Sequence, residues 1–272
     1  MSSTLHQKLE FLIVDPQNDF SDAPDAALPV TGAGADAERL AHLLERLRDR
    51  IDGIRVTLDT HQLLDIAHPV FWVDDAGRRP APFTQISVAD VENGIWHAYD
   101  GHTQQRALAY VRALRDNGRY QLTIWPPHCL IGTWGHNVMP VVAKALRAWE
   151  EAKFARVDYV IKGHNPWTEH YSAVQADVPD PADPGTQINR RLIQVLENAD
   201  VVALSGQALS HCVANTVRDI ADQFGQASIR KLVLIEDTSS PVPGFEPLAD
   251  QFLADMKQRG MRTVKAAEFM CA

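Results

Sequence analysis

The sequence predicts a three-layer α/β fold, in which helices cover both faces of a parallel sheet. Short, almost wholly apolar runs alternate along the chain with segments of helical periodicity. These runs lack the polar–apolar alternation of a half-exposed strand, so we expect their strands to be buried on both faces. No repeat, low-complexity tract or linker divides the 272 residues, which predicts a single domain over residues 1–272.

Each element follows from a local pattern. Four apolar runs predict strands, and two further runs are candidates for the same sheet: 11–14, 54–58, 201–206 and 231–236, then 121–125 and 158–163. Leucines and other apolar residues at three- and four-residue spacing predict helices at 37–51, 189–199, 212–225 and 247–260. Gly225 and Gly260 are the expected stops of the last two helices.

An insertion at about 69–120 interrupts the alternation of expected strands and helices. It is rich in proline, glycine, aspartate and aromatic residues, and it holds one expected helix at 103–118. Long excursions inside a compact domain are usually lids, binding loops or oligomer contacts. Because its aromatic side chains must be buried somewhere, and because both of its ends lie beside candidate site residues, we expect Phe71, Trp72, Phe83 or Trp96 to lie close to the active-site cavity.

Composition bounds the range of partners. The net charge of −9 opposes binding to nucleic acid or an anionic membrane, so a small-molecule substrate is expected, and a homo-oligomer is left open. No apolar stretch approaches the roughly 20 residues of a membrane span, and the polar N-terminus does not resemble a signal peptide. Three cysteines are a sparse, odd set that favours a reducing cytoplasm over a disulfide framework.

Reactive side chains follow five of the expected strands. Asp15 follows the first, Asp59 and His61 the second, and His128, Lys162 and Cys212 the others. Taken singly, such residues are more often turn formers, surface charges or inert core. Because the carboxyl ends of parallel strands share one edge of a sheet, where α/β proteins bind their ligands, their joint placement predicts an active site there.

Cys212 is the expected nucleophile of this site. It opens the helix expected at 212–225, where the helix dipole would lower the thiol pKa and favour the thiolate. The alternative is a small buried hydrophobic residue at the start of a helix. That alternative is preferred for Cys129, which lies between His128 and Leu130, and Cys271 near the C-terminus is taken as incidental.

A metal site is the second expectation. Asp59 and His61 alternate along an extended segment, so both side chains can face one ion, and His68 could join them after a turn. His128 from another strand end would complete the set. Mixed carboxylate and imidazole ligands without thiolate suit zinc first, with iron or manganese also compatible.

Five separated motifs together resemble the nicotinamidases and the wider isochorismatase-like cysteine hydrolases. They are FLIVDPQNDF, DTH, WPPHC, IKG followed by EHYSA, and SGQALSHCV, in the order seen in that family. The likeness runs from Phe11 to about Asp237 and leaves out the insertion and the C-terminal tail. It implies a Rossmann-like sheet of about six strands and the hydrolysis of a small carboxamide through a thioester, most readily of nicotinamide to nicotinate and ammonia.

The resemblance also assigns roles to residues. Asp15 would be the base, Lys162 would stabilise the charged forms of Asp15 and the thiolate, and Cys212 would attack the carbonyl carbon. A cis peptide at Gln207–Ala208 would turn the N–H of Ala208 toward that of Cys212 to form an oxyanion hole. The metal ligands would be Asp59, His61 and His128, with His68 as a fourth in some members; Trp125, Gln207 and Phe20 are the expected pocket residues.

Two alternatives remain at this stage. The first is an enzyme of the same family acting on another amide, a carbamoyl compound or an isochorismate-like substrate. The second is a binding protein that keeps the fold without catalysis, although such a protein would be expected to have lost part of the catalytic triad. The long insertion bears on the choice of substrate and not on the reaction class.

Overall fold

The computed structural model describes residues 7–118 and 120–271 of the chain. Within them lies a six-stranded sheet whose paired strands are all parallel. From one edge to the other the strands are β10 (Arg262–Val264), β9 (Leu232–Ile235), β8 (Val201–Gly206), β1 (Leu9–Val14), β2 (Gly53–Asp59) and β7 (Asp158–Lys162). The central strands β1 and β8 are buried throughout, as apolar strands covered on both faces should be.

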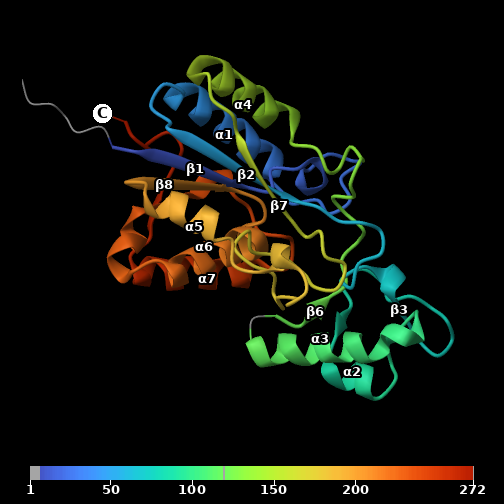
Figure 1. Ribbon diagram of the computed structural model, residues 1–272. Coiled ribbons are helices and arrows are strands. Elements are labelled where there is room, and N and C mark those ends of the chain that lie inside the picture. The colour runs from blue at the N-terminus through green and yellow to red at the C-terminus, as the bar shows by residue number, and fades with distance from the viewer. Residues whose placement is uncertain (1–6, 119, 272) are drawn as a thin grey trace, which may run out of the picture.

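Helices form the two outer layers (Figure 1). One face is covered by α1 (Ala33–Leu47) and α4 (Pro140–Lys153), and the other by α5 (Arg190–Glu197), α6 (Ala214–Gln223) and α7 (Glu246–Arg259). Each layer has its own apolar core against the sheet, built on Leu40 and Trp149 on the first face and on Val217 and Phe252 on the second. The three-layer α/β/α architecture expected from the sequence is therefore confirmed.

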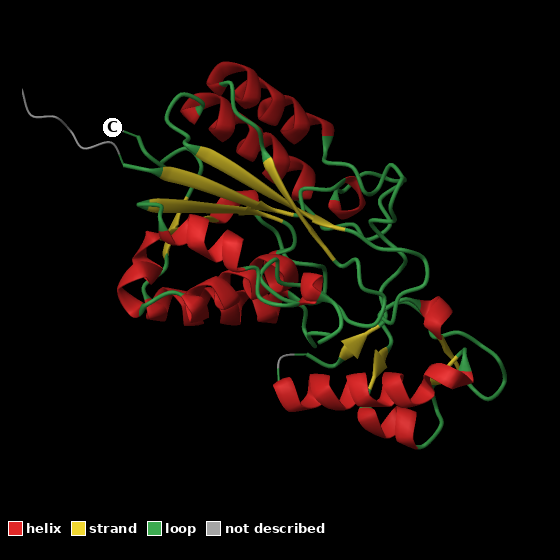
Figure 2. Ribbon diagram, in the orientation of Figure 1, coloured by secondary structure: helices red, strands yellow, loops and turns green. Residues whose placement is uncertain are grey.

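The insertion, together with residues 121–123, forms a small lobe beside the sheet, in which short strands lie next to helices (Figure 2). Its strands are β3 (Trp72–Val73) with β5 (His97–Ala98), and β4 (Gln85–Ile86) with β6 (Leu122–Thr123), both pairs antiparallel. Its helices are α2 (Val88–Glu92) and α3 (Gln104–Asn117), and α3 ends on Gly118 in the left-handed conformation. The helix expected at 103–118 is thus present.

The expectation that 121–125 joins the main sheet is wrong. Leu122 and Thr123 pair with β4 in the lobe, and Pro126 and Pro127 follow directly. Since proline has no N–H to donate, the chain cannot continue there as a central strand. The sixth strand of the main sheet is β10, which follows α7 and which the sequence reading did not identify.

None of the helices within the described residues combines the length and the apolar character that a bilayer-spanning segment requires.

Candidate active site

Four neighbouring strands of the sheet bring the expected catalytic side chains to one edge. In spatial order β8, β1, β2 and β7 carry Cys212, Asp15, Asp59 and Lys162 at or just beyond their carboxyl ends. All four residues are buried. The register of the ladders sets their order, because Asp59 of β2 pairs directly with Lys162 of β7. Gly206 ends β8 with a positive φ of 116°, and a Cβ there would collide with the backbone of Val14.

Lys162 contacts the other three residues of this group. Its Nζ lies 2.9 Å from Asp15 Oδ2, 3.0 Å from Asp59 Oδ1 and 3.6 Å from Cys212 Sγ. Burial alone would lower the pKa of Lys162, but the two carboxylates raise it well above its ordinary value, so the ammonium stays charged. The structure therefore brings together Asp15, Lys162 and Cys212 as the sequence reading expected.

Asp15 is held by a residue that the sequence reading missed. Its N–H donates to Thr57 Oγ1 at 3.0 Å, and the Thr57 hydroxyl donates to its carboxylate. Asp15 itself has a φ of 44°, which is uncommon outside glycine. Burial raises the pKa of Asp15 despite the neighbouring Lys162, which suits a carboxylate that must accept a proton. Thr57 lies inside an apolar strand, and no sequence pattern marked it.

The expected thiolate at Cys212 is not what the structure favours at rest. Cys212 lies in a π-helical turn, Leu209–Val213, and α6 begins only at Ala214. Burial raises the pKa of the Cys212 thiol well above its ordinary value, although Lys162 lowers it in part. At rest Cys212 is therefore a thiol, which would need a base to act as a nucleophile. A carboxylate oxygen of Asp15 lies within 4.8 Å of Cys212 Sγ and can fill that role.

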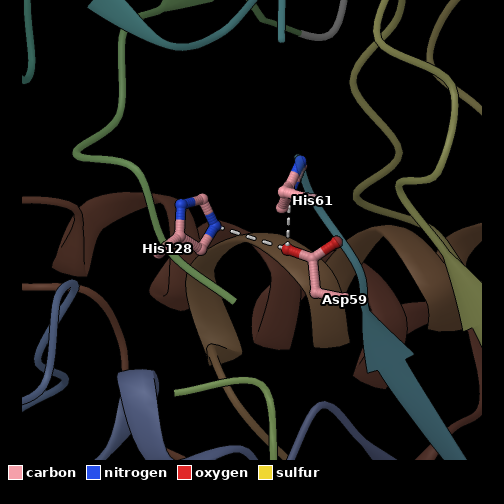
Figure 3. Close-up of side chains that lie close together, drawn as sticks. All are labelled: Asp59, His61 and His128. Atoms are coloured by element: carbon pink, nitrogen blue, oxygen red, sulfur yellow. Dashed lines mark hydrogen bonds and ion pairs between the residues drawn. The ribbon is translucent and has the colours of Figure 1, made fainter. Parts of the chain in front are cut away.

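The candidate metal ligands lie together beside the triad (Figure 3). Asp59 Oδ2 is 3.1 Å from His61 Nε2 and 3.4 Å from His128 Nε2, and the ligand atoms of the three residues lie within 4.8 Å of one another. His128 reaches this position because the loop after β6 pairs with the extension of β2. There the backbone N–H of His61 donates to the Cys129 carbonyl at 3.1 Å, and the backbone N–H of Ile131 donates to the His61 carbonyl at 3.0 Å.

The ring nitrogens show that this cluster fits a cation. Nδ1 of His128 faces the Pro126 carbonyl at 2.9 Å, Nδ1 of His68 faces the Leu63 carbonyl at 3.2 Å, and Nδ1 of His61 faces the Asp65 carboxylate at 3.0 Å. These oxygens only accept, so Nδ1 of each ring carries a proton, and Nε2 is the nitrogen left to face a metal ion.

Nε2 of His61 and Nε2 of His128 face the same carboxylate oxygen of Asp59. The carboxylates of Asp59 and Asp65 raise the pKa of His61 well above its ordinary value despite burial, so the cluster attracts positive charge, which a metal ion could supply in place of the proton. The His68 ring lies 5.2 Å from that of His61 and 5.7 Å from that of His128, and its Nε2 is buried without a partner. Asp59, His61 and His128 therefore form a group that could hold a metal ion, and His68 lies beside it with its Nε2 unpartnered.

A small cavity joins the nucleophile to the candidate metal ligands. Its wall includes Cys212, Asp59, His128 and two of the expected pocket residues, Trp125 and Phe20. Its volume of about 20 Å³ holds roughly one water molecule. A ring-sized substrate can enter only after side chains of the wall move apart.

Gln207 does not line this cavity, which corrects the expectation for that residue. Its amide donates to Asp36 at 2.9 Å and accepts from the Ser240 N–H at 3.1 Å, so its side chain is engaged between α1 and the segment after β9. The Gln207–Ala208 peptide bond is cis, as the resemblance implied, and Ala208 lies in the cavity wall with Cys212.

Glu169, His170, Tyr171 and His211 also line the cavity, and the sequence reading assigned none of them. The first three belong to the EHYSA motif and His211 to the SGQALSHCV motif, so their place within these motifs was the available signal. Burial raises the pKa of Glu169 to about 8 and lowers that of His170 to about 3. The cavity thus holds polar groups beyond the triad and the metal ligands.

The insertion contributes no side chain directly to the wall. None of Phe71, Trp72, Phe83 and Trp96 lines the cavity among the described residues. Trp72 is buried within the lobe, where its Nε1 donates to the Ile66 carbonyl at 2.7 Å. The link to the cavity is indirect, because the Phe83 ring packs edge-on against Trp125 with centroids 5.8 Å apart.

Comparisons with known proteins give a consistent fold. A scan against protein-family models finds no match, and a search of curated proteins finds none either. Among solved structures, a nicotinamidase/pyrazinamidase of Acinetobacter baumanii is similar with a TM-score of 0.65 and 19% identity, covering 97% of this chain and 99% of that one.

Two further solved structures are similar to this chain over most of its length. The yeast nicotinamidase gives a TM-score of 0.64 at 18% identity over 94% of this chain and 99% of that one. A zinc-bound pyrazinamidase of Pyrococcus horikoshii gives 0.55 at 18% identity over 95% and 99%. At these identities the comparisons show that the chain shares their fold, which is the fold that the motifs indicated.

Proposed function

We propose that this chain, which has the fold of the nicotinamidases and isochorismatase-like proteins, is a metal-assisted cysteine hydrolase of small ring carboxamides. The observation that carries the proposal is the contact of Lys162 with Asp15, Asp59 and Cys212 beside a histidine cluster suited to a metal. Nicotinamide, hydrolysed to nicotinate and ammonia, is the substrate we favour. It matches the names of the structurally similar proteins and the pairing of a nucleophile with a site for a ring nitrogen.

The first half of the proposed reaction forms a thioester. Asp15 accepts the thiol proton as Cys212 Sγ bonds to the amide carbon, and the N–H groups of Ala208 and Cys212 stabilise the oxyanion. The proton then passes from Asp15 to the amide nitrogen, the C–N bond breaks, and ammonia leaves. Lys162 remains cationic throughout and offsets the negative charge that moves between carboxylate and sulfur.

The second half hydrolyses that thioester. Asp15 takes a proton from water as the water oxygen bonds to the acyl carbon. The C–S bond then breaks, the proton returns to sulfur, and the carboxylic acid is released. Asp15 is thus a proton carrier in both halves, for which its raised pKa and its anchoring by Thr57 are suited.

The metal would be held by Asp59, His61 and His128, with His68 as a fourth ligand, and zinc is the ion we favour. When bound, it would act as a Lewis acid toward a substrate ring nitrogen and so fix the orientation of the amide. The shared carboxylate of Asp59, which contacts both the histidines and Lys162, connects the metal ligands to the triad. An isochorismate-like substrate has no ring nitrogen to use such a site, which disfavours that alternative.

The test is ammonia release from nicotinamide by metal-loaded protein, followed by mass spectrometry of Cys212 under single-turnover conditions. We expect turnover and an acyl adduct on Cys212. If metal-loaded, folded protein releases no ammonia from nicotinamide or related ring carboxamides, the proposed function is wrong and the fold serves another substrate or a binding role.

A further inference from the structure

His211 is a polar group in the cavity wall that the proposed mechanism does not use. It directly precedes the nucleophile in the π-helical turn Leu209–Val213 and lines the same cavity as Cys212. Its ring is fixed on several sides by aromatic neighbours. Tyr120 stacks on it with centroids 5.4 Å apart, Trp125 packs edge-on at 5.2 Å, and Phe245 edge-on at 4.9 Å. Its orientation is therefore set before any substrate arrives.

A short chain of hydrogen bonds determines which nitrogen of His211 carries the proton. The Val242 N–H donates to Ser210 Oγ at 3.1 Å, and Ser210 Oγ lies 2.9 Å from His211 Nδ1. Among the described residues, His211 Nδ1 is the acceptor available to the Ser210 hydroxyl. The hydroxyl therefore donates to Nδ1, and the proton of the neutral imidazole resides on Nε2.

The imidazole is neutral at physiological pH. Burial lowers the pKa of His211 to about 4. Nε2–H forms no hydrogen bond with a described residue, and in contrast to His68 Nε2 it is not sealed off within the protein. A fixed neutral donor is thus left available to the cavity, beside the aromatic rings of Trp125 and Tyr171.

We infer that His211 is a specificity-determining hydrogen-bond donor, which selects ring carboxamides bearing a second acceptor in addition to the ring nitrogen assigned to the metal. This inference rests on the proposed function and ranks substrates within it. Nicotinamide remains a substrate, and ring carboxamides that offer His211 the second acceptor are expected to have a higher kcat/KM. The acceptor is a second ring nitrogen or an oxygen substituent. Without an acceptor on the substrate, the His211 N–H has no hydrogen-bond partner in the bound complex. Substrates that carry the acceptor should therefore have a higher kcat/KM than those that do not.

The test compares substrates that differ only in the position of one ring nitrogen. Nicotinamide is measured beside pyridazine-3-, pyrazine-2-, pyrimidine-5- and pyridazine-4-carboxamide, which place a second nitrogen at each remaining ring position that keeps the first nitrogen meta to the amide. Hydroxynicotinamides extend the series to oxygen acceptors. Values of kcat/KM are determined for metal-loaded parent enzyme and for His211→Phe and His211→Gln, because the glutamine amide keeps a donor and the phenyl ring does not.

The readout is the ratio of each kcat/KM to that of nicotinamide, so that intrinsic reactivity cancels between variants. For at least one acceptor-bearing substrate, we expect His211→Phe to lower this ratio about tenfold and His211→Gln to restore much of it, the size of one neutral hydrogen bond. If His211→Phe lowers kcat/KM by the same factor for every substrate, the inference is refuted, and His211 only packs in the cavity wall. If His211→Phe does not fold, an unchanged ratio in His211→Leu refutes the inference equally. Failure of the parent to hydrolyse any member refutes the proposed function itself.

Discussion

The strand-end site and the lobe of residues 72–123 are built by opposite means. In the site, four adjacent parallel strands fix four polar side chains within a few ångströms, around a cavity of only about 20 Å³. In the lobe, the β4–β6 pair and the helices α2 and α3 line a wider, open and largely apolar pocket of about 590 Å³, whose wall includes Val111, Leu114 and Leu122. The larger pocket contains none of the triad. Convergence of chemistry at strand ends, and not cavity size, therefore identifies the active site.

Replacing Cys212 by serine should have the largest effect of any change in the strand-end site. A serine hydroxyl is a much weaker nucleophile than a cysteine sulfur once Asp15 removes the proton, so we expect kcat for nicotinamide to fall at least about 10³-fold. Thermal unfolding and metal content should be unchanged, because the substitution is nearly isosteric. Cys271→Ser, which alters an exposed cysteine, is the matched control and should keep parent activity. Substantial turnover by Cys212→Ser would exclude the thioester.

Removing the metal should have the next largest effect. Exhaustive chelation is expected to lower kcat/KM by about 10²–10³-fold, the scale of lost orientation, and added zinc should restore it. His128→Ala should abolish stoichiometric metal binding in elemental analysis, whereas His42→Ala on the exposed side of α1 should not. Full activity in metal-free protein would contradict the assignment and leave Asp59 and the histidines as packed polar groups.

Most strands of the main sheet could be predicted because each is marked by residues that are consecutive in the sequence. Apolar runs ending in Asp15, Asp59 and Lys162 identify both the strand and the residue at its rim. The strand at 121–125 was misassigned because an apolar run does not reveal its pairing partner, and here the partner is Gln85–Ile86 of the lobe. The proline pair after Trp125 was the signal against a central strand.

The same limit explains the residues that were missed or misplaced. Thr57 acts through a hydrogen bond to Asp15 across two strands, and the ring of His211 is fixed by those of Tyr120, Trp125 and Phe245. Both depend on contacts between segments far apart in the sequence. Gln207 was expected in the pocket because it neighbours Ala208, but its side chain is bound by Asp36 and Ser240. Adjacency along the chain did not predict which way the side chain lies.

A buried neutral histidine next to the nucleophile should make stability depend on pH. The His211 pKa of about 4 lies below its ordinary value of 6.5. The unfolded chain therefore binds a proton that the folded chain does not, and stability is lost as pH falls from 6.5 toward 4. At pH 4.5 the loss should be about 2–3 kcal/mol for this residue. We would measure the free energy of unfolding in urea at pH 7 and at pH 4.5. Its decrease between the two pH values should be smaller in His211→Phe than in the parent by about this amount. Equal losses in both proteins would mean that His211 does not titrate in this range.

The smallest predicted effect tests whether the lobe influences the strand-end site at all. Phe83 is the residue through which it could do so, since its ring packs against Trp125 in the cavity wall while half of its surface remains exposed. An aromatic pair of this kind contributes about 0.5–1.5 kcal/mol. Phe83→Ala should therefore raise KM for nicotinamide by roughly two- to tenfold, with kcat nearly unchanged, because Trp125 keeps its hydrogen bond of 2.9 Å to the Tyr171 hydroxyl. Tyr99→Ala, at a more exposed aromatic of the same lobe, is the matched control and should change neither constant. A loss of kcat as large as that of Cys212→Ser would restore the lid interpretation, whereas identical behaviour of the two lobe variants would mean that the lobe and the site are energetically independent.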